Sequence, residues 1–301
     1  MNMMKNTVFA ALGLLLIVSC KKDDDGISVT PPRDRGEVQL ESEANLEAYL
    51  ETHFYNYEEF QNPPADFDYK IKFDTISGAN ADKIALIDHE NMIKRDYLYR
   101  ETNYSLYVLI ARQGEGLQPT FADSTFVNYQ GNVVGGDRFD ATVTPIWLDL
   151  ASTIFGFGNG LKELKAGTGI TQNEDGSFNY GDDYGIGAVF IPSGLGYFNN
   201  GGVGYSAYSD FVFRFNLYGV VPDTDTDDDG IPNHMEDVNG NNYLLESEDD
   251  TDGDGFSNFQ DRDDDGDGIP TREEIVINED GSITFTDSNN DDTPDYLDPD
   301  N

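Results

Sequence analysis

The feature that most constrains the folding of this chain is the acidity of residues 223–301. This segment contains 28 Asp and Glu residues against two basic residues, Arg262 and Arg272, so it carries a net charge of −26 out of −40 for all 301 residues. Carboxylates at this density repel one another, and the few apolar residues between them cannot offset the repulsion by forming a core. The segment therefore needs cations to become compact. The same acidity argues against a nucleic-acid partner, because phosphate backbones are repelled as well.

The carboxylates follow a spacing that is typical of calcium-binding loops. The stretch DTDDDGIPNHME places acids at loop positions 1, 3, 5 and 12, a glycine at position 6 and a backbone carbonyl at position 7. Alternating carboxylates can converge on one ion, the glycine permits a sharp turn, and the last acid can bind with both oxygens. Three copies keep this register, a further copy has Asp292 in place of the glycine, and a degenerate copy begins at Asp237. The predicted metal ligands are Asp225, Asp227, Asp229, Ile231 and Glu236; Asp250, Asp252, Asp254, Phe256 and Asp261; Asp263, Asp265, Asp267, Ile269 and Glu274; and Asp287, Asn289, Asp291, Thr293 and Asp298.

Ligand type and local sequence narrow the kind of site. Oxygen-only ligands favour calcium over zinc or copper. Helices should flank the loops of an EF-hand, but Pro232, Pro270 and Pro294 follow position 7 and the copies crowd together. Residues 222–301 instead resemble thrombospondin type 3 repeats, which implies a largely irregular tail wrapped around structural calcium ions. The alternative is a solvated acidic tail. Between the last two copies, the stretch IVINEDGSITFTD is typical of a small hairpin that turns at Asp280 and Gly281.

The N-terminus has the pattern of a secretory signal. Lys5 precedes an apolar run over residues 8–18, which is too short to span a bilayer. The stretch IVSC that follows resembles a bacterial lipobox, which implies a signal peptide over residues 1–19, cleavage before Cys20 and acylation of its thiol. The alternative is a short hydrophobic leader with an incidental cysteine.

Two further inferences follow from this N-terminus. Cys20 is the only cysteine, so no disulfide can form within the chain. The stretch KKDDD after it resembles an acidic export signal for the outside of the outer membrane, although a charged linker after a lipid anchor explains it equally well. Residues 20–36 are expected to be a tether, and the predicted localisation is the bacterial cell envelope, as an outer-membrane lipoprotein that is exposed at the surface if the export signal is genuine.

The centre of the chain combines helical and strand patterns. Residues 37–103 are expected to form a mixed region with an amphipathic helix from about 38 to 54, a short strand at YKIKF and a possible helix around IALIDHENMIKR. From Tyr104 the stretches YSLYVLIA, DSTFVNYQG and FVFRFNLYGV have the composition of strands. Between them Phe157, Leu161 and Leu164 share one face of a short helix that ends at Gly167. Several antiparallel strands and one helix predict an α+β fold.

Residues 104–221 contain, in this order, the stretches FVNYQGNVVGGDRFDAT, IFGFGNGLKELKAG, VFIPSGLGY and DFVFRFNLYGV. Together these four stretches resemble the FKBP-type peptidyl-prolyl cis-trans isomerases. The resemblance implies an antiparallel half-barrel sheet around the short helix, an aromatic pocket between them, proline-containing polypeptides as substrates and no cofactor for catalysis. We refer to residues 104–221 as the FKBP-like segment.

The resemblance also assigns roles to single residues. Position by position, Tyr129, Phe139 and Asp140 match the pocket tyrosine, phenylalanine and aspartate, Ile154 a backbone contact to substrate, Phe157 the pocket floor, Tyr197 the tyrosine that hydrogen-bonds the ligand carbonyl, and Tyr205 and Phe213 parts of the wall.

Three departures from the family affect the pocket and its surroundings. The floor residue is usually tryptophan but is Phe157 here, and Ile146 stands where an aromatic residue is common. The stretch TGITQNEDGSFNYGDDYG is inserted before a strand at IGAVFIP. These changes bear on substrate preference more than on the fold.

The carboxylate of Asp140 needs a physical explanation, because aspartate is depleted in strands and costly to bury without a partner. We expect the Tyr129 hydroxyl to hold it at the edge of the pocket. The alternative is a turn aspartate that caps backbone amides.

Three functions fit the sequence. The leading interpretation is a lipid-anchored peptidyl-prolyl isomerase that assists the folding of envelope or exported proteins and has a calcium-stabilised tail. A second is a non-catalytic peptide-binding or chaperone module with the same fold. A third is a surface adhesion or spacer protein in which the calcium-bound rod is the functional part.

The lipid anchor can be tested by replacing Cys20 with serine. The variant should remain uncleaved and unacylated, because the thiol that accepts the lipid is missing. Incorporation of labelled fatty acid measures this directly, and incorporation at the wild-type level would exclude Cys20 as the anchor.

Overall fold

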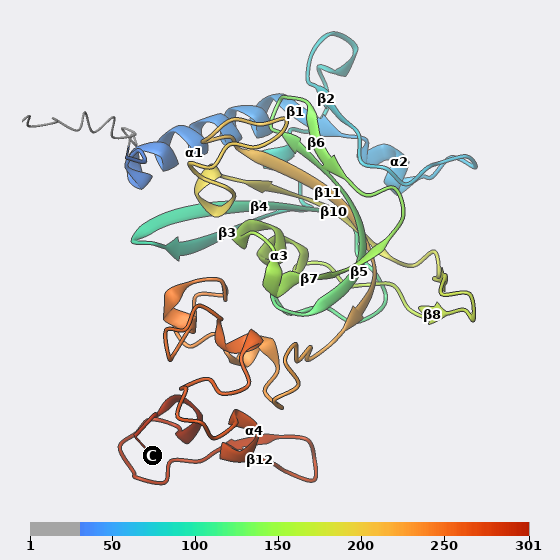
Figure 1. Ribbon diagram of the computed structural model, residues 1–301. Helices are drawn as coiled ribbons and strands as arrows, with labels where there is room; N and C mark the ends of the chain where they lie inside the picture. The colour runs from blue at the N-terminus through green and yellow to red at the C-terminus, as the bar shows by residue number, and fades with distance from the viewer. Residues whose placement is uncertain (1–30, 301) are drawn as a thin grey trace, which may run out of the picture. The chain divides into compact units, whose positions relative to one another are not determined.

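A seven-stranded antiparallel sheet organises the structure, a computed structural model that describes residues 31–300 (Figure 1). The strand order is β3-β4-β10-β11-β5-β6, and β7 pairs with β5. The predicted signal peptide, Cys20 and most of the tether lie outside the described residues. The strands are β3 (Met92–Tyr99), β4 (Thr102–Arg112), β5 (Ser124–Val133), β6 (Arg138–Ala141), β7 (Ile146–Asp149), β10 (Gly185–Ile191) and β11 (Phe211–Val221).

Both faces of the central strands are buried. On β11, Phe211, Phe213 and Phe215 point into one hydrophobic cluster, whereas Val212 belongs to a second cluster on the opposite face. Arg214 also points to the opposite face, where it donates to the backbone oxygen of Ile71 at 3.0 Å. Successive side chains of a strand point to opposite faces, so each face receives every second residue.

Helix α3 (Phe155–Leu161) fills the concave face of the sheet, which curves around it in Figure 1. Two glycines allow this close contact. A Cβ atom on Gly156 would lie 2.4 Å from Ile191 Cγ2, and one on Gly160 would lie 2.5 Å from Val189 Cγ2. Both partners belong to β10, so the helix backbone packs directly onto that strand. The antiparallel sheet around a short helix is confirmed. The helix ends at Leu161, however, so Leu164 and the expected stop at Gly167 lie beyond it.

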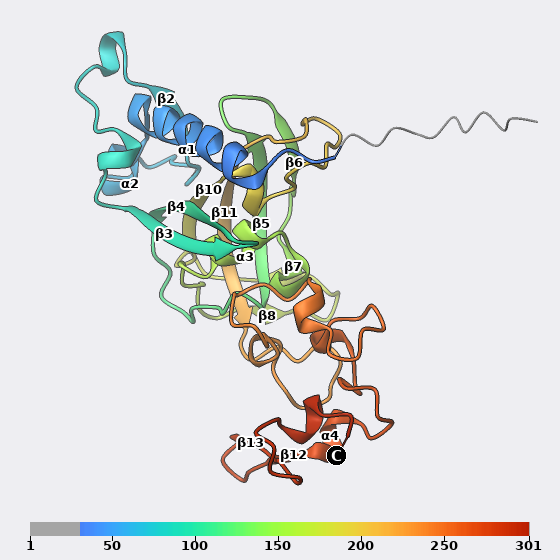
Figure 2. The ribbon, with the colours of Figure 1, turned by 90° about the vertical axis from the view of Figure 1, so that its left-hand side faces the viewer.

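Helix α1 (Arg35–Thr52) covers the opposite face of the sheet (Figure 2). Asp34 caps its first turn, because the carboxylate accepts the amide of Glu37 at 3.0 Å. Leu46 and Leu50 of α1 are fully buried in the second hydrophobic cluster. The helix predicted at residues 38–54 is thus present and begins slightly earlier.

The segment between α1 and β3 differs from the prediction. The expected helix around residues 84–95 is wrong: the structure has a 3-10 turn, η2 (Leu86–Asp88), followed by β3, which pairs with β4 along its whole length. Partner pairing decides the conformation of a short apolar run whose own pattern fits either element. Of the expected strand at YKIKF, only Phe73 lies in a strand. The other elements here are β1 (His53–Tyr55), α2 (Tyr57–Gln61), β2 (Phe73–Thr75) and η1 (Gly78–Asn80).

Short elements complete the FKBP-like segment. The inserted stretch before β10 contains a small hairpin whose two strands are two residues long. A single 3-10 turn precedes α3, and another follows β10. These elements are η3 (Leu150–Ser152), β8 (Thr171–Gln172), β9 (Phe178–Asn179) and η4 (Ser193–Leu195).

Within residues 222–300 the helices are single turns of three or four residues, so the long flanking helices of an EF-hand are not present in this part of the chain. The predicted hairpin around Asp280 and Gly281 is confirmed, since β12 pairs antiparallel with β13. A small apolar cluster joins Ile231, Ile275 and Tyr296. The elements are η5 (Asn233–Met235), η6 (Ser247–Asp249), η7 (Asn258–Gln260), α4 (Thr271–Glu274), β12 (Ile275–Ile277), β13 (Ile283–Phe285) and η8 (Asp295–Leu297).

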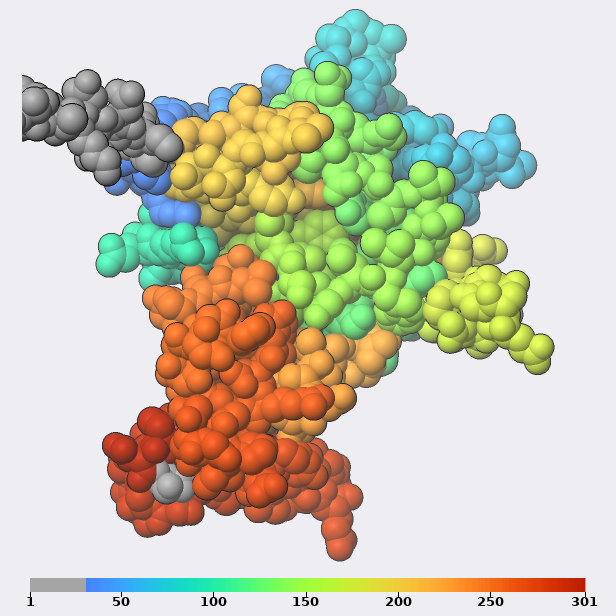
Figure 3. Space-filling view, in the orientation of Figure 1, coloured from blue at the N-terminus to red at the C-terminus, as the bar shows by residue number. Residues whose placement is uncertain are grey.

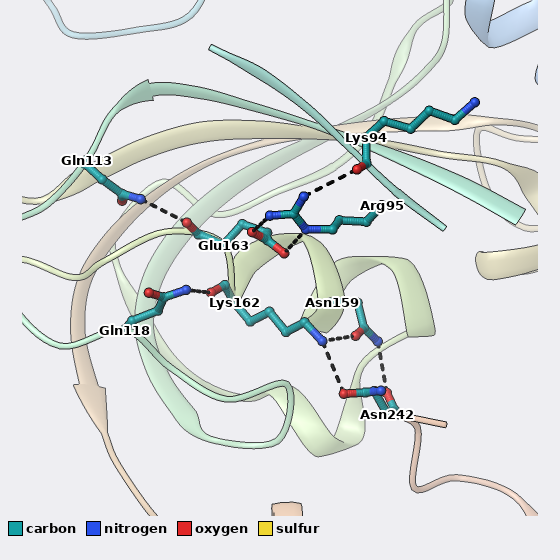
Figure 4. A network of polar contacts seen from close by, with 8 residues as sticks. All are labelled: Lys94, Arg95, Gln113, Gln118, Asn159, Lys162, Glu163 and Asn242. Atoms are coloured by element: carbon teal, nitrogen blue, oxygen red, sulfur yellow. Dashed lines mark hydrogen bonds and ion pairs between the residues drawn. The ribbon is translucent and has the colours of Figure 1, made fainter. Parts of the chain in front are cut away.

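The acidic segment contacts the FKBP-like segment beside α3. Tyr243 packs on Phe155, with ring centroids 5.6 Å apart. Asn159 of α3 donates to the backbone oxygen of Asn242 at 2.9 Å, and Lys162 donates to the Asn242 side chain at 3.2 Å (Figure 4). None of the helices within residues 31–300 combines the length and apolarity needed to cross a bilayer.

The same contact includes a buried leucine that can be tested. Leu244 is 1% exposed and packs with Phe259, Ala122 and Ala151. Leu244→Ala should cost about 2–5 kcal/mol at this site, because truncating a buried leucine leaves a cavity. Proteolytic cleavage within residues 222–301 should become faster, since cleavage follows the population of the opened form.

Leu245 supplies the matched control for this prediction. It is 37% exposed, so Leu245→Ala should change the cleavage rate little. Equal cleavage rates for the two variants would show that Leu244 does not hold the acidic segment in place.

Candidate functional site

Seven aromatic side chains from five parts of the FKBP-like segment meet on the concave face of the sheet. β5, β6, α3, the loop after β10 and β11 contribute them, and in Figure 3 that loop (yellow) and the segment around β6 (green) flank a depression. We call the group the aromatic basin. Its members are Tyr129, Phe139, Phe157, Tyr197, Tyr205, Phe211 and Phe213.

The rings of the aromatic basin contact one another mostly edge to face. Phe157 meets Phe213 at 5.2 Å between centroids and 87°, and Tyr129 at 5.5 Å and 77°. Tyr197 and Tyr205 are stacked at 5.1 Å. Edge-to-face pairs at these separations are favourable beyond the area they bury. The interlocking contacts hold each ring in place and give the basin a defined shape.

A glycine makes room for two of these rings. Gly131 of β5 pairs with Phe213 of β11, and a Cβ atom there would lie 2.6 Å from the Phe213 ring and 2.9 Å from the Phe139 ring. Any larger residue would displace one of them. The sequence pattern around Gly131 therefore serves the site as well as the strand.

Asp140 makes the hydrogen bond that the sequence predicts. The Tyr129 hydroxyl donates to Asp140 Oδ2 at 2.8 Å, and Asp140 is solvent-exposed at the rim of the basin. Burial, followed by the hydrogen bond to Asp140, raises the pKa of Tyr129 to about 12. The hydroxyl therefore stays protonated at neutral pH and keeps Asp140 in place. No backbone amide within residues 31–300 donates to the Asp140 side chain, as a capping turn aspartate would require.

Tyr197 has a hydroxyl without a hydrogen-bond partner in the described part of the chain. Burial is the main cause of its raised pKa, followed by the neighbouring Tyr205 and Asp140. Its half-buried, protonated hydroxyl is therefore able to donate to a ligand. Ile154 is the N-cap residue of α3, and its carbonyl accepts the amide of Phe157 at 2.9 Å.

Two residues near the basin need separate comment. Phe211 was not predicted as a site residue, yet its ring lies 5.1 Å from Phe139 and 5.5 Å from Tyr197. Its alternation with Phe213 on one strand was the signal that could have identified it. Ile146, by contrast, is 37% exposed at the start of β7 and pairs with Val127.

The acidic segment contains five loops with the predicted register, which we call repeat loops 1 to 5 (residues 225–236, 237–248, 250–261, 263–274 and 287–298). In each of them the residue at position 6 has a positive φ, the conformation that favours glycine. In loop 5 an aspartate adopts it instead, at a steric cost. The φ angles are 102° at Gly230, 66° at Asn242, 101° at Gly255, 94° at Gly268 and 76° at Asp292.

Hydrogen bonds within each loop engage some carboxylate oxygens and leave others without a hydrogen-bond partner. In loop 1, Asp225 accepts the amide of Gly230 at 3.0 Å, Asp227 accepts that of Asp229 at 3.2 Å and Asp229 accepts that of Ile231 at 2.7 Å. The second oxygens of Asp227 and Asp229 are buried without a hydrogen-bond partner in the described residues. A cation is the usual partner for buried carboxylate oxygens of this kind.

The structure brings several predicted ligands together. The acids at positions 1, 3 and 5 of loops 1, 3 and 4 each place one oxygen within 4.8 Å of the others. A further group combines Asp229 and Glu236 with Asp264, which the sequence did not predict. In loop 5, Asn289 replaces the acid at position 3 and donates to Asp298 at 2.7 Å.

Other predicted ligands occupy the expected loop positions but do not belong to one of these groups of three converging acids. Asp261 at position 12 of loop 3 accepts the amide of Asp263 at 3.1 Å, and Glu274 at position 12 of loop 4 ends α4 and is 7% exposed. At position 7, the amides of Phe256, Ile269 and Thr293 donate to the carboxylates of Asp254, Asp267 and Asp291.

Sequence comparisons connect two parts of the chain to known proteins. Residues 226–286 match the family model described as BamM C-terminal. The probable FKBP-type peptidyl-prolyl cis-trans isomerase FkpA of Neisseria meningitidis is 30% identical over 126 residues, which cover 41% of this chain and 39% of that protein. The chain thus spans about two fifths of the length of this curated relative. The predicted similarity to FKBP-type isomerases is supported over part of the chain, at low identity.

Two solved structures also resemble this chain. A peptidyl-prolyl cis-trans isomerase from Pseudomonas syringae is 21% identical and covers 44% of this chain and 82% of its own, with a TM-score of 0.33. FkpA from Escherichia coli is 21% identical and covers 62% and 63%, with a TM-score of 0.36. Similarity at these scores is too low to support an argument about the activity.

Proposed function

We propose that the chain is a peptidyl-prolyl cis-trans isomerase of the FKBP type that acts on proline-containing polypeptides. The observation that carries the proposal is the aromatic basin, whose rim holds the Tyr129–Asp140 hydrogen bond and the unpaired Tyr197 hydroxyl. A cluster of aromatic rings beside a surface depression (Figure 3), with the hydroxyl groups of Tyr197 and Tyr205 free of hydrogen-bond partners within residues 31–300, is suited to a proline ring next to a carbonyl group.

The chemistry of the reaction explains why such a basin is sufficient. Rotation about an X-Pro amide has a barrier of about 18–20 kcal/mol, because twisting removes the resonance of the bond. The twisted amide is less polar than the planar one, so an apolar site that excludes water favours it. A 10⁵-fold acceleration requires about 7 kcal/mol of preference for the twisted state. Packing of the proline ring in the aromatic basin and a hydrogen bond from Tyr197 to the substrate carbonyl contribute to that preference.

Asp140 has a positioning role in this proposal. Its carboxylate lies at the rim and fixes the Tyr129 ring through the hydroxyl. Its negative charge faces the side from which a substrate carbonyl carbon enters. No nucleophile or general base is needed, because rotation about the amide bond makes and breaks no covalent bond.

A second function has a specific observation in its favour. Phe157 occupies the floor of the basin, where the FKBP family usually has the larger tryptophan ring. A smaller ring at this position makes fewer contacts with the twisted amide, so it favours simple binding of a proline-containing segment over stabilisation of the transition state. The alternative is therefore a non-catalytic peptide-binding or chaperone module.

We further propose that residues 222–301 hold structural calcium ions. The buried carboxylate oxygens of Asp227, Asp229 and Asp265 without hydrogen-bond partners fit oxygen-seeking divalent cations. The ions would screen the repulsion between loops and order them. A lipid anchor at Cys20 would tether the protein to the bacterial outer membrane, where it would assist the folding of envelope proteins. A surface spacer built on the calcium-bound segment remains the third candidate function.

Isomerase activity can be tested with Tyr197→Phe in the full-length protein. The variant removes one hydroxyl and keeps the ring, so a lost hydrogen bond of about 0.5–1.5 kcal/mol should lower kcat/KM roughly 2- to 10-fold. A protease-coupled assay on a peptide with an apolar residue before proline measures this. The melting temperature should stay nearly constant.

Tyr180→Phe is the matched control, because Tyr180 is 41% exposed and lies outside the aromatic basin. Its kcat/KM should equal that of the wild type. A folded wild-type protein that gives no acceleration over the uncatalysed peptide would decide for the binding-module alternative.

The calcium proposal can be tested by removing divalent cations from the full-length protein. A chelator should expand residues 222–301, since the carboxylates then repel one another without compensation. Small-angle scattering should report a larger radius in chelator than in millimolar calcium. The aromatic near-ultraviolet signal of the FKBP-like segment should persist. An identical radius under both conditions would contradict the proposal.

A further inference from the structure

Position 2 of the repeat loops has a common structural task in three of them. A hydroxyl residue at position 2 hydrogen-bonds the side chain at position 9. Asn233 donates to Thr226 at 2.9 Å in loop 1, and Asn258 donates to Thr251 at 2.9 Å in loop 3. In loop 5, Ser288 donates to Asp295 at 2.8 Å. Position 2 therefore closes the loop and faces away from the ligands at positions 1, 3 and 5.

Loop 4 breaks this pattern with an acid. Its position 2 is Asp264, whose backbone amide donates to the Thr271 hydroxyl at 3.2 Å. The backbone amides at position 2 of loops 1, 3 and 5 donate to position 9 in the same way. Loop 4 therefore differs only in its side chain, because Asp264 is released from the second hydrogen bond that position 2 makes in those loops. The side chain is 1% exposed, and neither carboxylate oxygen has a hydrogen bond of normal geometry from the described residues.

The released carboxylate points into loop 1. Oxygens of Asp264, Asp229 and Glu236 all lie within 4.8 Å of one another. Asp229 and Glu236 are positions 5 and 12 of loop 1, and each is also 1% exposed. Both oxygens of Glu236 and the second oxygen of Asp229 are without hydrogen-bond partners in the described residues. Three buried acids from two loops therefore face the same point.

No basic side chain within residues 31–300 forms an ion pair with these three acids. Arg262, which lies nearby, donates to the backbone oxygen of Asp227 and pairs with exposed Asp228 at 3.6 Å. A group of buried acids is stable as carboxylates only when a cation compensates them.

We propose that Asp264 is a ligand of the calcium ion in loop 1, so that one ion joins loop 1 to loop 4. The inference deepens the calcium proposal above and rests on it. Apolar contacts also hold loop 4 close to loop 1. Ile231 of loop 1 packs with Ile275, which directly follows loop 4, and with Tyr296. The ion at loop 1 is then a cross-link between distant parts of the acidic segment, whereas an ion held only by positions 1 to 12 of its own loop orders that loop alone.

The experiment compares Asp264→Asn with the wild type in the full-length protein, with and without calcium. In chelator the variant should melt at nearly the wild-type temperature, because the acidic segment is then already expanded and Asp264 is no longer buried. In millimolar calcium it should melt at a lower temperature, because the ion has lost a charged ligand. Calorimetric titration with calcium should show one site weakened at least 10-fold and the others unchanged.

Two further variants keep the test decisive. Asp264→Thr installs the residue type found at position 2 of loops 1 and 3 and should weaken the same site. Asp228→Asn is the matched control, since Asp228 lies in loop 1 with a side chain that is 86% exposed, and asparagine tolerates its positive φ. The control should leave calcium affinity nearly unchanged.

The possible outcomes separate the two proposals. A wild-type protein that binds no calcium would overturn the calcium proposal and this inference together. Calcium binding by the wild type with unchanged affinity in both Asp264 variants would overturn this inference alone. A shift of the melting temperature in the same direction with and without calcium would show that Asp264 has only a packing role and would also overturn it.

Discussion

The rest of the structure depends on the direct packing of helix α3 against strand β10. The helix sequence FGFGNGL contains three glycines, each of which disfavours a helix by about 0.5–1 kcal/mol relative to alanine. Such a helix is stable only where packing compensates, and the missing side chains at Gly156 and Gly160 are what permit that packing. The curved sheet supports the helix, and the helix in turn positions the floor of the aromatic basin through Phe157. The other side of the helix receives Tyr243 and Asn242 of the acidic segment.

Much of this arrangement could be predicted from the sequence, because it rests on side-chain types at fixed spacing. Local sequence patterns predict three of its features correctly. These are the strand at residues 211–217, the turn at Gly281 and the glycines at position 6 of the repeat loops. The hydrogen bond between Tyr129 and Asp140 was also predictable, since a rim aspartate beside an aromatic strand needs a partner.

Features that depend on distant parts of the chain could not be predicted in this way. The stretch IALIDHENMIKR, residues 84–95, has an apolar pattern that fits a helix, but its last four residues belong to β3 and pair with β4. Asp264 stands outside the repeat register, so its spacing gave no reason to place it with Asp229 and Glu236. Phe211 was assigned to the core face of its strand, but the loop that brings Tyr197 and Tyr205 against it is fixed by tertiary packing.

The alternation of side chains on β11 has a consequence for how the chain avoids misfolding. Phe213 belongs to the aromatic basin, while Arg214 on the other face donates to the backbone of Ile71 and to Asn132. A slip of the strand by one residue would exchange the two faces. The guanidinium would then enter the aromatic basin and lose its two present acceptors, and a phenyl ring would take its place beside those polar groups. Any slip by an odd number of residues is therefore unfavourable on both faces of the strand at once, and this disfavours such pairings before any ligand is present.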